Sequence, residues 1–163
     1  MIFQYLTLLC WVGITVVTYF LARNDIKTHR VPNKVNLAIA IGAIVPIVLE
    51  CLVPGAVIWK VIVSHLCGGI FAFGLMLFAA LISKGGFGGG DIKLLGALGL
   101  WYGVFSSLGL TFFSALAYLG FIAFKRTTMA KQGKEPPKVF PYVPFVFIAT
   151  LIVTVITAIV KLS

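Results

Sequence analysis

Two aspartates are the side chains in this sequence best suited to catalysis. The chain has 163 residues, of which 61% are hydrophobic and only four are acidic. Asp25 follows an apolar run in ARNDIKTHRVPN, and Asp91 follows five glycines within six positions in KGGFGGGDIKLLG. A carboxylate near hydrocarbon is costly. A strongly apolar chain that places two of them beside apolar segments therefore marks both as candidates for function.

Two carboxylates held close together have a specific chemistry. They cannot both ionise cheaply, so they share one proton. One then acts as a base on a water molecule, while the other, protonated, polarises a peptide carbonyl. Other hydrolytic arrangements are poorly supplied, because His65 and Cys67 lie two apart on one predicted helix and do not face each other. The sequence has no HExxH pattern and no CxxC pair, so we expect neither a metal ion nor a cofactor.

Each aspartate also has a purely structural interpretation. Asp25 could cap a helix or balance the charges of Arg23 and Lys27, and Asp91 could cap the helix that follows it. Three consecutive glycines precede Asp91, namely Gly88, Gly89 and Gly90. They favour the functional alternative, because residues without a Cβ let a backbone or a substrate strand approach a carboxylate closely.

The composition places these aspartates in a membrane protein. Only 10% of the residues are charged and the mean hydropathy is +1.12, whereas ordinary soluble domains have about 25% charged residues. Six segments approach or exceed the roughly 20 residues that a membrane helix needs. They are Ile2–Ala22, Val35–Val53, Val57–Ser83, Ile92–Gly103, Val104–Phe124 and Tyr142–Val160. We predict an all-α, polytopic protein with about six transmembrane helices in one membrane-embedded domain, residues 1–163.

Some of these segments have irregular features. The fourth, with about 12 residues, spans only about 18 Å and cannot cross a hydrocarbon core alone. Pro46 is predicted to kink the second. Glycines on the third and fourth segments indicate close helix packing, and they are Gly68, Gly69, Gly74, Gly96, Gly99 and Gly103. We expect the fourth helix to pack against the first, so that Asp25 and Asp91 meet.

The basic residues predict the orientation. Eleven of the thirteen Lys and Arg residues fall on loops that six helices place on one side, namely Arg23, Lys27, Arg30, Lys34, Lys84, Lys93, Lys125, Arg126, Lys131, Lys134 and Lys138. The positive-inside rule makes that side cytoplasmic, with both termini outside and both aspartates on the cytoplasmic face. Lipid headgroups and topology explain the net charge of +9, so membrane lipids, and not nucleic acid, are the expected partners.

The remaining polar residues receive simpler interpretations. Glu50 and Glu135 are expected to be solvated surface charges. Lys93 lies two residues past Asp91, so on a helix it points to another face and is expected to contact headgroups. Pro32 stiffens the chain before the second helix, and Asn33 can cap that helix.

The motifs around the aspartates resemble a known family. GGGD at 88–91 fits the GxGD signature of membrane aspartyl proteases, a group that includes presenilin-like proteases and type IV prepilin peptidases. FGGGDIKLLGALGLWYG looks like the prepilin peptidase version of this motif. DIKTHRVPN at 25–33 is similar to that family's first motif, an aspartate followed seven residues later by Pro-Asn. FPYVP at 140–144 is similar to its proline-rich C-terminal segment.

The resemblance implies the GxGD aspartyl protease fold, with Asp25 and Asp91 as catalytic residues facing the cytoplasm of a bacterial inner membrane. It implies prepilin or pseudopilin substrates, cut between a short basic leader and a hydrophobic helix, with the pilus assembly machinery as a further partner. Larger members carry a zinc-binding CxxC insert and also N-methylate the product. This chain has neither CxxC pair nor insert and resembles the short, peptidase-only branch of tight-adherence (Flp-type) pili. We therefore expect no methyltransferase activity.

Site-shaping or substrate-access roles are expected for Pro32 and Asn33, and for Gly88, Gly89 and Gly90. Two alternatives to a protease remain open. A small transporter or channel subunit could use Asp25 and Asp91 to handle protons or cations. Against it, both aspartates are predicted at one interface, and no polar residues are seen to continue a path across the membrane. The other alternative is an inactive scaffold of the pilus assembly machinery.

Overall fold

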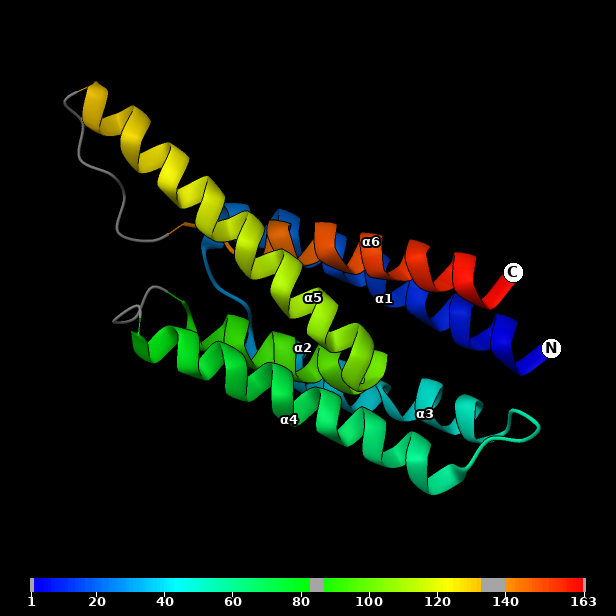
Figure 1. The fold of residues 1–163 in the computed structure, drawn as a ribbon. Helices are drawn as coiled ribbons and strands as arrows, with labels where there is room; N and C mark the ends of the chain where they lie inside the picture. The colour runs from blue at the N-terminus through cyan, green and yellow to red at the C-terminus, as the bar shows by residue number, and fades with distance from the viewer. Residues whose placement is uncertain (1, 83–86, 133–139, 163) are drawn as a thin grey trace.

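The chain folds into a bundle of α-helices. The computed structural model describes residues 2–82, 87–132 and 140–162, and within these ranges all regular structure is helical. The elements are α1 (Ile2–Thr28), α2 (Asn33–Gly42), α3 (Ile44–Cys51), α4 (Ile58–Ile82), α5 (Gly89–Lys131) and α6 (Val143–Leu162) (Figure 1). The predicted all-α, polytopic architecture is confirmed. Lys84, Lys134, Glu135 and Lys138 lie outside the described residues.

The described helices include five stretches that are long and apolar enough to cross a membrane, and α2 and α3 together form one of them. These two short helices are separated at Ala43. Pro46 has no N–H for the carbonyl of Gly42, four residues earlier, and its ring crowds that carbonyl. The interruption therefore falls one turn before the proline, within the segment where the kink is predicted.

The long helix α5 contains two legs that meet at Gly103. This glycine has φ 70° and ψ 176°, which is not helical. The rings of Phe87 and Tyr118 lie 5.1 Å apart, whereas a straight helix would separate residues 31 apart by about 46 Å. The second leg of α5 therefore turns back toward the end of the bundle where the first leg begins (Figure 1). The predicted fourth and fifth segments are confirmed, with their boundary after Gly103 and no loop between them.

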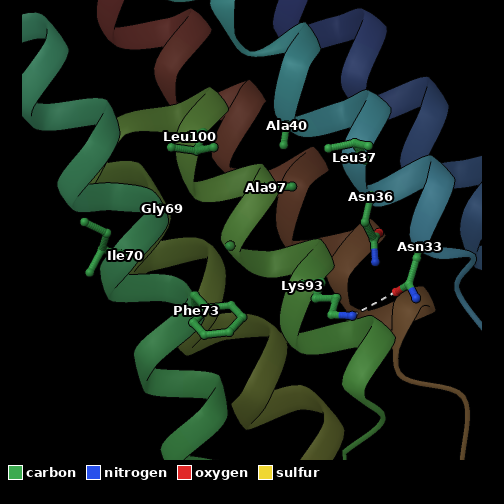
Figure 2. Close-up of a pocket in the computed structure, with 11 residues that line it drawn as sticks. Asn33, Asn36, Leu37, Ala40, Gly69, Ile70, Phe73, Lys93, Ala97 and Leu100 are labelled. Atoms are coloured by element: carbon green, nitrogen blue, oxygen red, sulfur yellow. Dashed lines mark hydrogen bonds between the residues drawn. The ribbon is translucent and has the colours of Figure 1, made fainter.

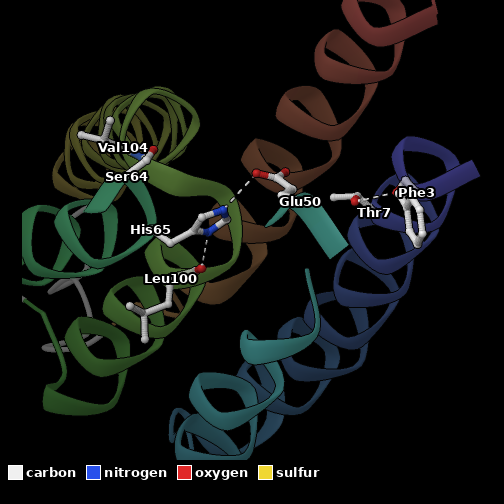
Figure 3. Close-up of polar contacts among 7 residues, drawn as sticks. All are labelled: Phe3, Thr7, Glu50, Ser64, His65, Leu100 and Val104. Carbon is white, nitrogen blue, oxygen red and sulfur yellow. Dashed lines mark hydrogen bonds and ion pairs between the residues drawn. The ribbon is translucent and has the colours of Figure 1, made fainter. Parts of the chain in front are cut away.

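The turn at Gly103 interrupts the ladder of backbone hydrogen bonds in α5, and α4 supplies substitute partners. Ser64 Oγ accepts a bond from the Val104 N–H at 3.3 Å. His65 Nδ1 lies 2.7 Å from the Leu100 carbonyl oxygen (Figure 3). An unpaired peptide group inside a membrane costs several kcal/mol, about as much as a lost core side chain. These two side chains therefore stabilise the sharp turn, because they satisfy backbone groups that it leaves without helical partners.

A buried histidine and a half-buried glutamate support the same turn. His65 is 2% exposed, and its Nε2 lies 3.1 Å from Glu50 Oε2 on α3. Because the Leu100 carbonyl can only accept, Nδ1 of His65 donates to it, and Nε2 faces the Glu50 carboxyl group. The prediction that Glu50 is a solvated surface charge is wrong, because a buried histidine partners it.

The first leg of α5 packs against α4 at backbone contact. A Cβ atom added at Gly68 would lie 2.6 Å from the Gly99 oxygen, and one added at Gly99 would overlap the backbone of Gly68. The glycines thus perform the predicted close packing. Gly74 is different, because a Cβ there would meet no atom of the described residues within 4 Å.

The first helix pairs with the last. Thr15 and Thr154 hydrogen-bond through their hydroxyls at 3.1 Å, and so do Thr18 and Thr150. The residue number rises in α1 as it falls in α6, so the two helices are antiparallel. The start of α1 and the end of α6 therefore lie side by side at one end of the bundle (Figure 1). The first helix does contact the fourth segment, through Trp11 and Tyr102, whose rings lie 4.8 Å apart, but it packs more extensively against α6.

Candidate active site

Asp25 lies in the last turn of α1, at the end of the bundle opposite the termini (Figure 1). Its side chain is only 4% exposed, and Oδ2 accepts the Val143 N–H at 3.1 Å. Val143 is the first residue of α6, where backbone N–H groups lack helical partners and the helix dipole favours negative charge. The contact continues the register of the threonine pairs between α1 and α6. The FPYVP stretch is thereby placed directly on Asp25.

Asp91 occupies the third position of α5, and Oδ2 accepts the Gly88 N–H at 3.3 Å. Gly88 precedes the helix in an extended conformation, with φ −70° and ψ 143°. The structural interpretation of Asp91 is thus correct in part, since the carboxylate satisfies a backbone donor at its own helix start. A carboxylate has about four acceptor positions, so this bond leaves most of its capacity for other contacts.

The fold brings the two aspartates together. Asp25 and Asp91 lie within electrostatic range of each other, although 66 residues separate them in sequence. Two tyrosines, Tyr118 and Tyr142, stand within range of this pair, and their rings are 5.0 Å apart. Aromatic walls of this kind exclude water and strengthen the interaction between nearby charges.

Tyr142 is a neutral polar group beside the aspartates. Its hydroxyl lies 2.8 Å from Ser114 Oγ on the second leg of α5 and 3.8 Å from the sulfur of Met76. The residue is 1% exposed, and burial raises the pKa of its hydroxyl well above the usual range. The phenol therefore stays protonated and joins α4, α5 and the start of α6.

A cavity of about 610 Å³ opens beside Asp91. Its lining comes from the connection after α1 and from the start of α5, and consists of His29, Arg30, Val31, Pro32, Asn33, Gly88, Gly89, Gly90, Asp91 and Lys93. All five residues predicted to shape the site therefore share one cavity with Asp91. Asp25, almost fully buried, is not among the described residues that line it. His29, at the turn after α1, has φ 50°, an uncommon conformation outside glycine.

The three glycines before Asp91 do different things. A Cβ at Gly90 would lie 2.9 Å from the Val31 oxygen, so this glycine makes room for the chain's own backbone. A Cβ at Gly88 would lie 3.1 Å from Asp91 Oδ2. A Cβ at Gly89 would meet no described atom within 4 Å. The backbone approach that the glycines predicted is therefore made by Val31 at Gly90.

Asn33 and Lys93, which both line this cavity, contact each other. Lys93 Nζ donates to Asn33 Oδ1 at 3.1 Å (Figure 2). The N-cap residue of α2 is Pro32, which makes no side-chain cap bond, so the prediction that Asn33 caps the helix is wrong. Lys93, for which headgroup contact is predicted, also joins α5 to the first aspartate motif.

Asn36 is the site residue that the sequence interpretation missed. It is 4% exposed, and its Nδ2 donates to the Gly90 carbonyl at 2.9 Å. Its Oδ1 is buried and has no hydrogen-bond partner among the described residues. An amide inside an apolar membrane helix is costly and is by default a candidate for function. The single asparagine one turn after Asn33 was the signal that could have identified it.

The fold and the site together define a class: a polytopic membrane protein in which aspartates from two helices converge at one end of the bundle. A model of the type IV leader peptidase family matches residues 8–123, most of the chain and both aspartates, and the chain belongs to this family. It is therefore a membrane peptidase of the leader peptidase type. No curated protein and no solved structure matches it significantly.

Membership of this family favours the peptidase over the transporter alternative. The prediction that no polar residues continue a path across the membrane is nevertheless wrong. Hydroxyl groups do continue from the aspartates into the bundle, at Thr18, Thr150, Thr15, Thr154 and Tyr102. They hydrogen-bond to one another and to backbone carbonyls. Their evident role is to hold α1 against α6.

Proposed function

We propose that this peptidase is an aspartic-type endopeptidase that removes the short basic leader from prepilins or pseudopilins. Asp25 and Asp91 are its catalytic residues. The observation that carries the proposal is the convergence of these two carboxylates from α1 and α5, within electrostatic range of each other. Each is held through one oxygen by a backbone N–H. The chain's other described acid, Glu50, is engaged by His65.

The proposed mechanism uses a single proton shared by the two carboxylates. The ionised carboxylate takes a proton from a water molecule, whose oxygen attacks the scissile carbonyl carbon. The protonated carboxyl donates to the carbonyl oxygen as negative charge develops there. Breakdown of the tetrahedral intermediate cleaves the C–N bond, and the carboxyl that took the water proton gives it to the leaving amine. The other carboxylate takes back the proton from the former carbonyl oxygen, which restores the shared-proton state. The aromatic surroundings of Tyr118 and Tyr142 favour this shared-proton state, because low polarity disfavours two adjacent charges.

The proposed orientation places the aspartates at the cytoplasmic face of a bacterial inner membrane, with both termini outside. The distribution of basic residues supports it, and basic residues such as Arg30 and Lys93 lie at the same end of the bundle as the aspartates. A single cysteine introduced at Gln132 should resist an impermeant thiol reagent added from outside. Outside labelling at Gln132 would reverse the orientation.

Co-expression with a prepilin tests the function directly, with leader removal measured by mass spectrometry. The wild type should release the leader, whereas Asp25→Asn and Asp91→Asn should not, although both should insert in normal amounts. We also propose the short, Flp-associated branch, without zinc or methylation. The product should then lack the mass of an added methyl group, and chelators should leave cleavage unchanged. Activity lost to a chelator and restored by zinc would refute the metal-free mechanism.

A further inference from the structure

An apolar groove of about 640 Å³ lies between α2, α4 and the first leg of α5. Its polar side chains, Asn33, Asn36 and Lys93, gather at one end (Figure 2). The rest of its lining is apolar or glycine. Asn33 and Lys93 also line the cavity of Asp91. The groove and that cavity are therefore neighbours that share the hydrogen-bonded Asn33–Lys93 pair as a common wall.

The groove faces the surroundings of the bundle. Leu37 on α2 is 62% exposed and Ile70 on α4 is 73% exposed. Ala97 of α5 lies between them in Figure 2, and Ala40 also contributes a short side chain. Small residues between larger apolar walls allow another helix to approach closely within a membrane.

We propose that this groove receives the apolar helix of the substrate, on the C-terminal side of the bond that is cut. This inference rests on the proposed function. A leader peptidase substrate changes from polar to apolar at its cleavage point, and the groove changes in the same way from the Asn33–Lys93 end. A helix lying in it would deliver its polar N-terminal junction past that pair to Asp91.

A second groove lacks this connection. It has a volume of about 410 Å³ and lies between α1 and α6, where Val12, Tyr19 and Phe147 contribute to its lining. It is equally apolar, but no residue is common to it and the Asp91 cavity. The second groove therefore serves as an internal control for apolar contact alone.

Site-specific photo-crosslinking tests the proposal. Benzoylphenylalanine replaces Leu37, Ile70 or, as the control, Val12, each in the Asp25→Asn background so that substrate persists. Val12 is 48% exposed, so the three positions present similar open surface. Each protein is reconstituted in vesicles with a prepilin that has a short basic leader and an apolar helix. Leu37 and Ile70 should crosslink to that helix, and Val12 should not.

The alternative occupants give distinct results. Adducts with lipid alone, or with a second copy of the enzyme, at Leu37 and Ile70 would overturn the proposal, and so would substrate adducts at Val12 only. The same replacements in the wild-type background report leader cleavage. Cleavage without crosslinks in the groove refutes the binding of the substrate helix there but leaves the proposed function intact. Failure of the wild type to cleave any prepilin refutes the proposed function itself.

A kinetic measurement supports the crosslinks. Ala40→Trp should fill the groove and raise KM about tenfold with kcat nearly unchanged, as expected when binding common to the ground state and the transition state is lost. Val12→Trp should change neither constant. A fall in kcat at unchanged KM would place Ala40 in support of catalysis and contradict a docking role. Thermal stability in detergent is measured for both variants, and if Ala40→Trp unfolds, the exposed crosslinking positions decide.

Discussion

The two proposed catalytic aspartates are positioned by two helix pairs that pack in opposite ways. The first leg of α5, which carries Asp91, meets α4 through glycines at backbone contact. The helix α1, which carries Asp25, meets α6 through threonine hydroxyls and the Val143 N–H. The first pair depends on space that a single methyl group would fill. The second depends on several directional bonds, each of modest strength.

This difference predicts how each half of the site will fail. Close-packed backbones cannot adjust, because a dense interior transmits any added volume. A ladder of hydroxyl bonds loses one contact at a time. The position of Asp91 should therefore be sensitive to steric changes at the α4–α5 interface, whereas the position of Asp25 should tolerate the loss of single hydroxyl contacts between α1 and α6. Four predictions test this comparison, in order of decreasing effect.

The largest effect is expected when either aspartate is replaced, because each helix pair positions one of them. Asp25→Asn and Asp91→Asn should each lower kcat for leader cleavage by at least about a thousandfold, and the double variant should be no worse than either, because the two act as a unit. Single-turnover cleavage measures this. Additive losses would show that the aspartates work independently and would contradict the shared proton.

The glycine interface comes next. Gly68→Ala should destabilise the protein by about 1–3 kcal/mol or more, because its new methyl overlaps the α5 backbone. Gly74→Ala is the matched control on the same helix, and since its site is open it should leave stability unchanged or slightly improved. Thermal unfolding in detergent compares them. Equal stability of the two variants would remove the steric basis of the comparison.

The third prediction separates the glycines beside Asp91. Gly90→Ala should reduce cleavage on the order of a hundredfold, because displacing Val31 shifts the reacting groups by about 1 Å. Gly89→Ala, with open space around its Cβ, should cleave normally. Leader cleavage is measured alongside stability. Equal loss in both variants would favour the other interpretation, in which the glycines clear a path for the substrate strand.

The smallest effect on stability is expected for the hydroxyl bonds between α1 and α6. Thr18→Val and Thr150→Val should each cost about 0.6 kcal/mol, the average for a hydrogen bond within a membrane protein. Because the two residues share one bond, the double variant should cost less than the sum of the singles. Cleavage should change little, since the Val143 contact to Asp25 remains. A large loss of activity in either single variant would show that the position of Asp25 is as sensitive to changes in its helix contacts as the position of Asp91.

Much of the helical layout followed from the sequence alone. Apolar segments of membrane length are visible in composition, so the six legs were predicted, including the boundary after Gly103. Pro46 marked its kink because a missing N–H acts locally. The motifs around Asp25 and Asp91 identified the family and marked both residues as candidates without any knowledge of their spatial contacts.

Only the tertiary structure decided which helices are neighbours. Six similar apolar helices can pair in many ways in lipid, since hydropathy does not distinguish one partner from another. Three contacts join residues of different segments: α1 with α6, Val31 with Gly90, and Glu50 with His65. Local patterns determine where helices begin, end and turn. Complementary shape and polar partners across long sequence separations determine how they assemble around the two aspartates.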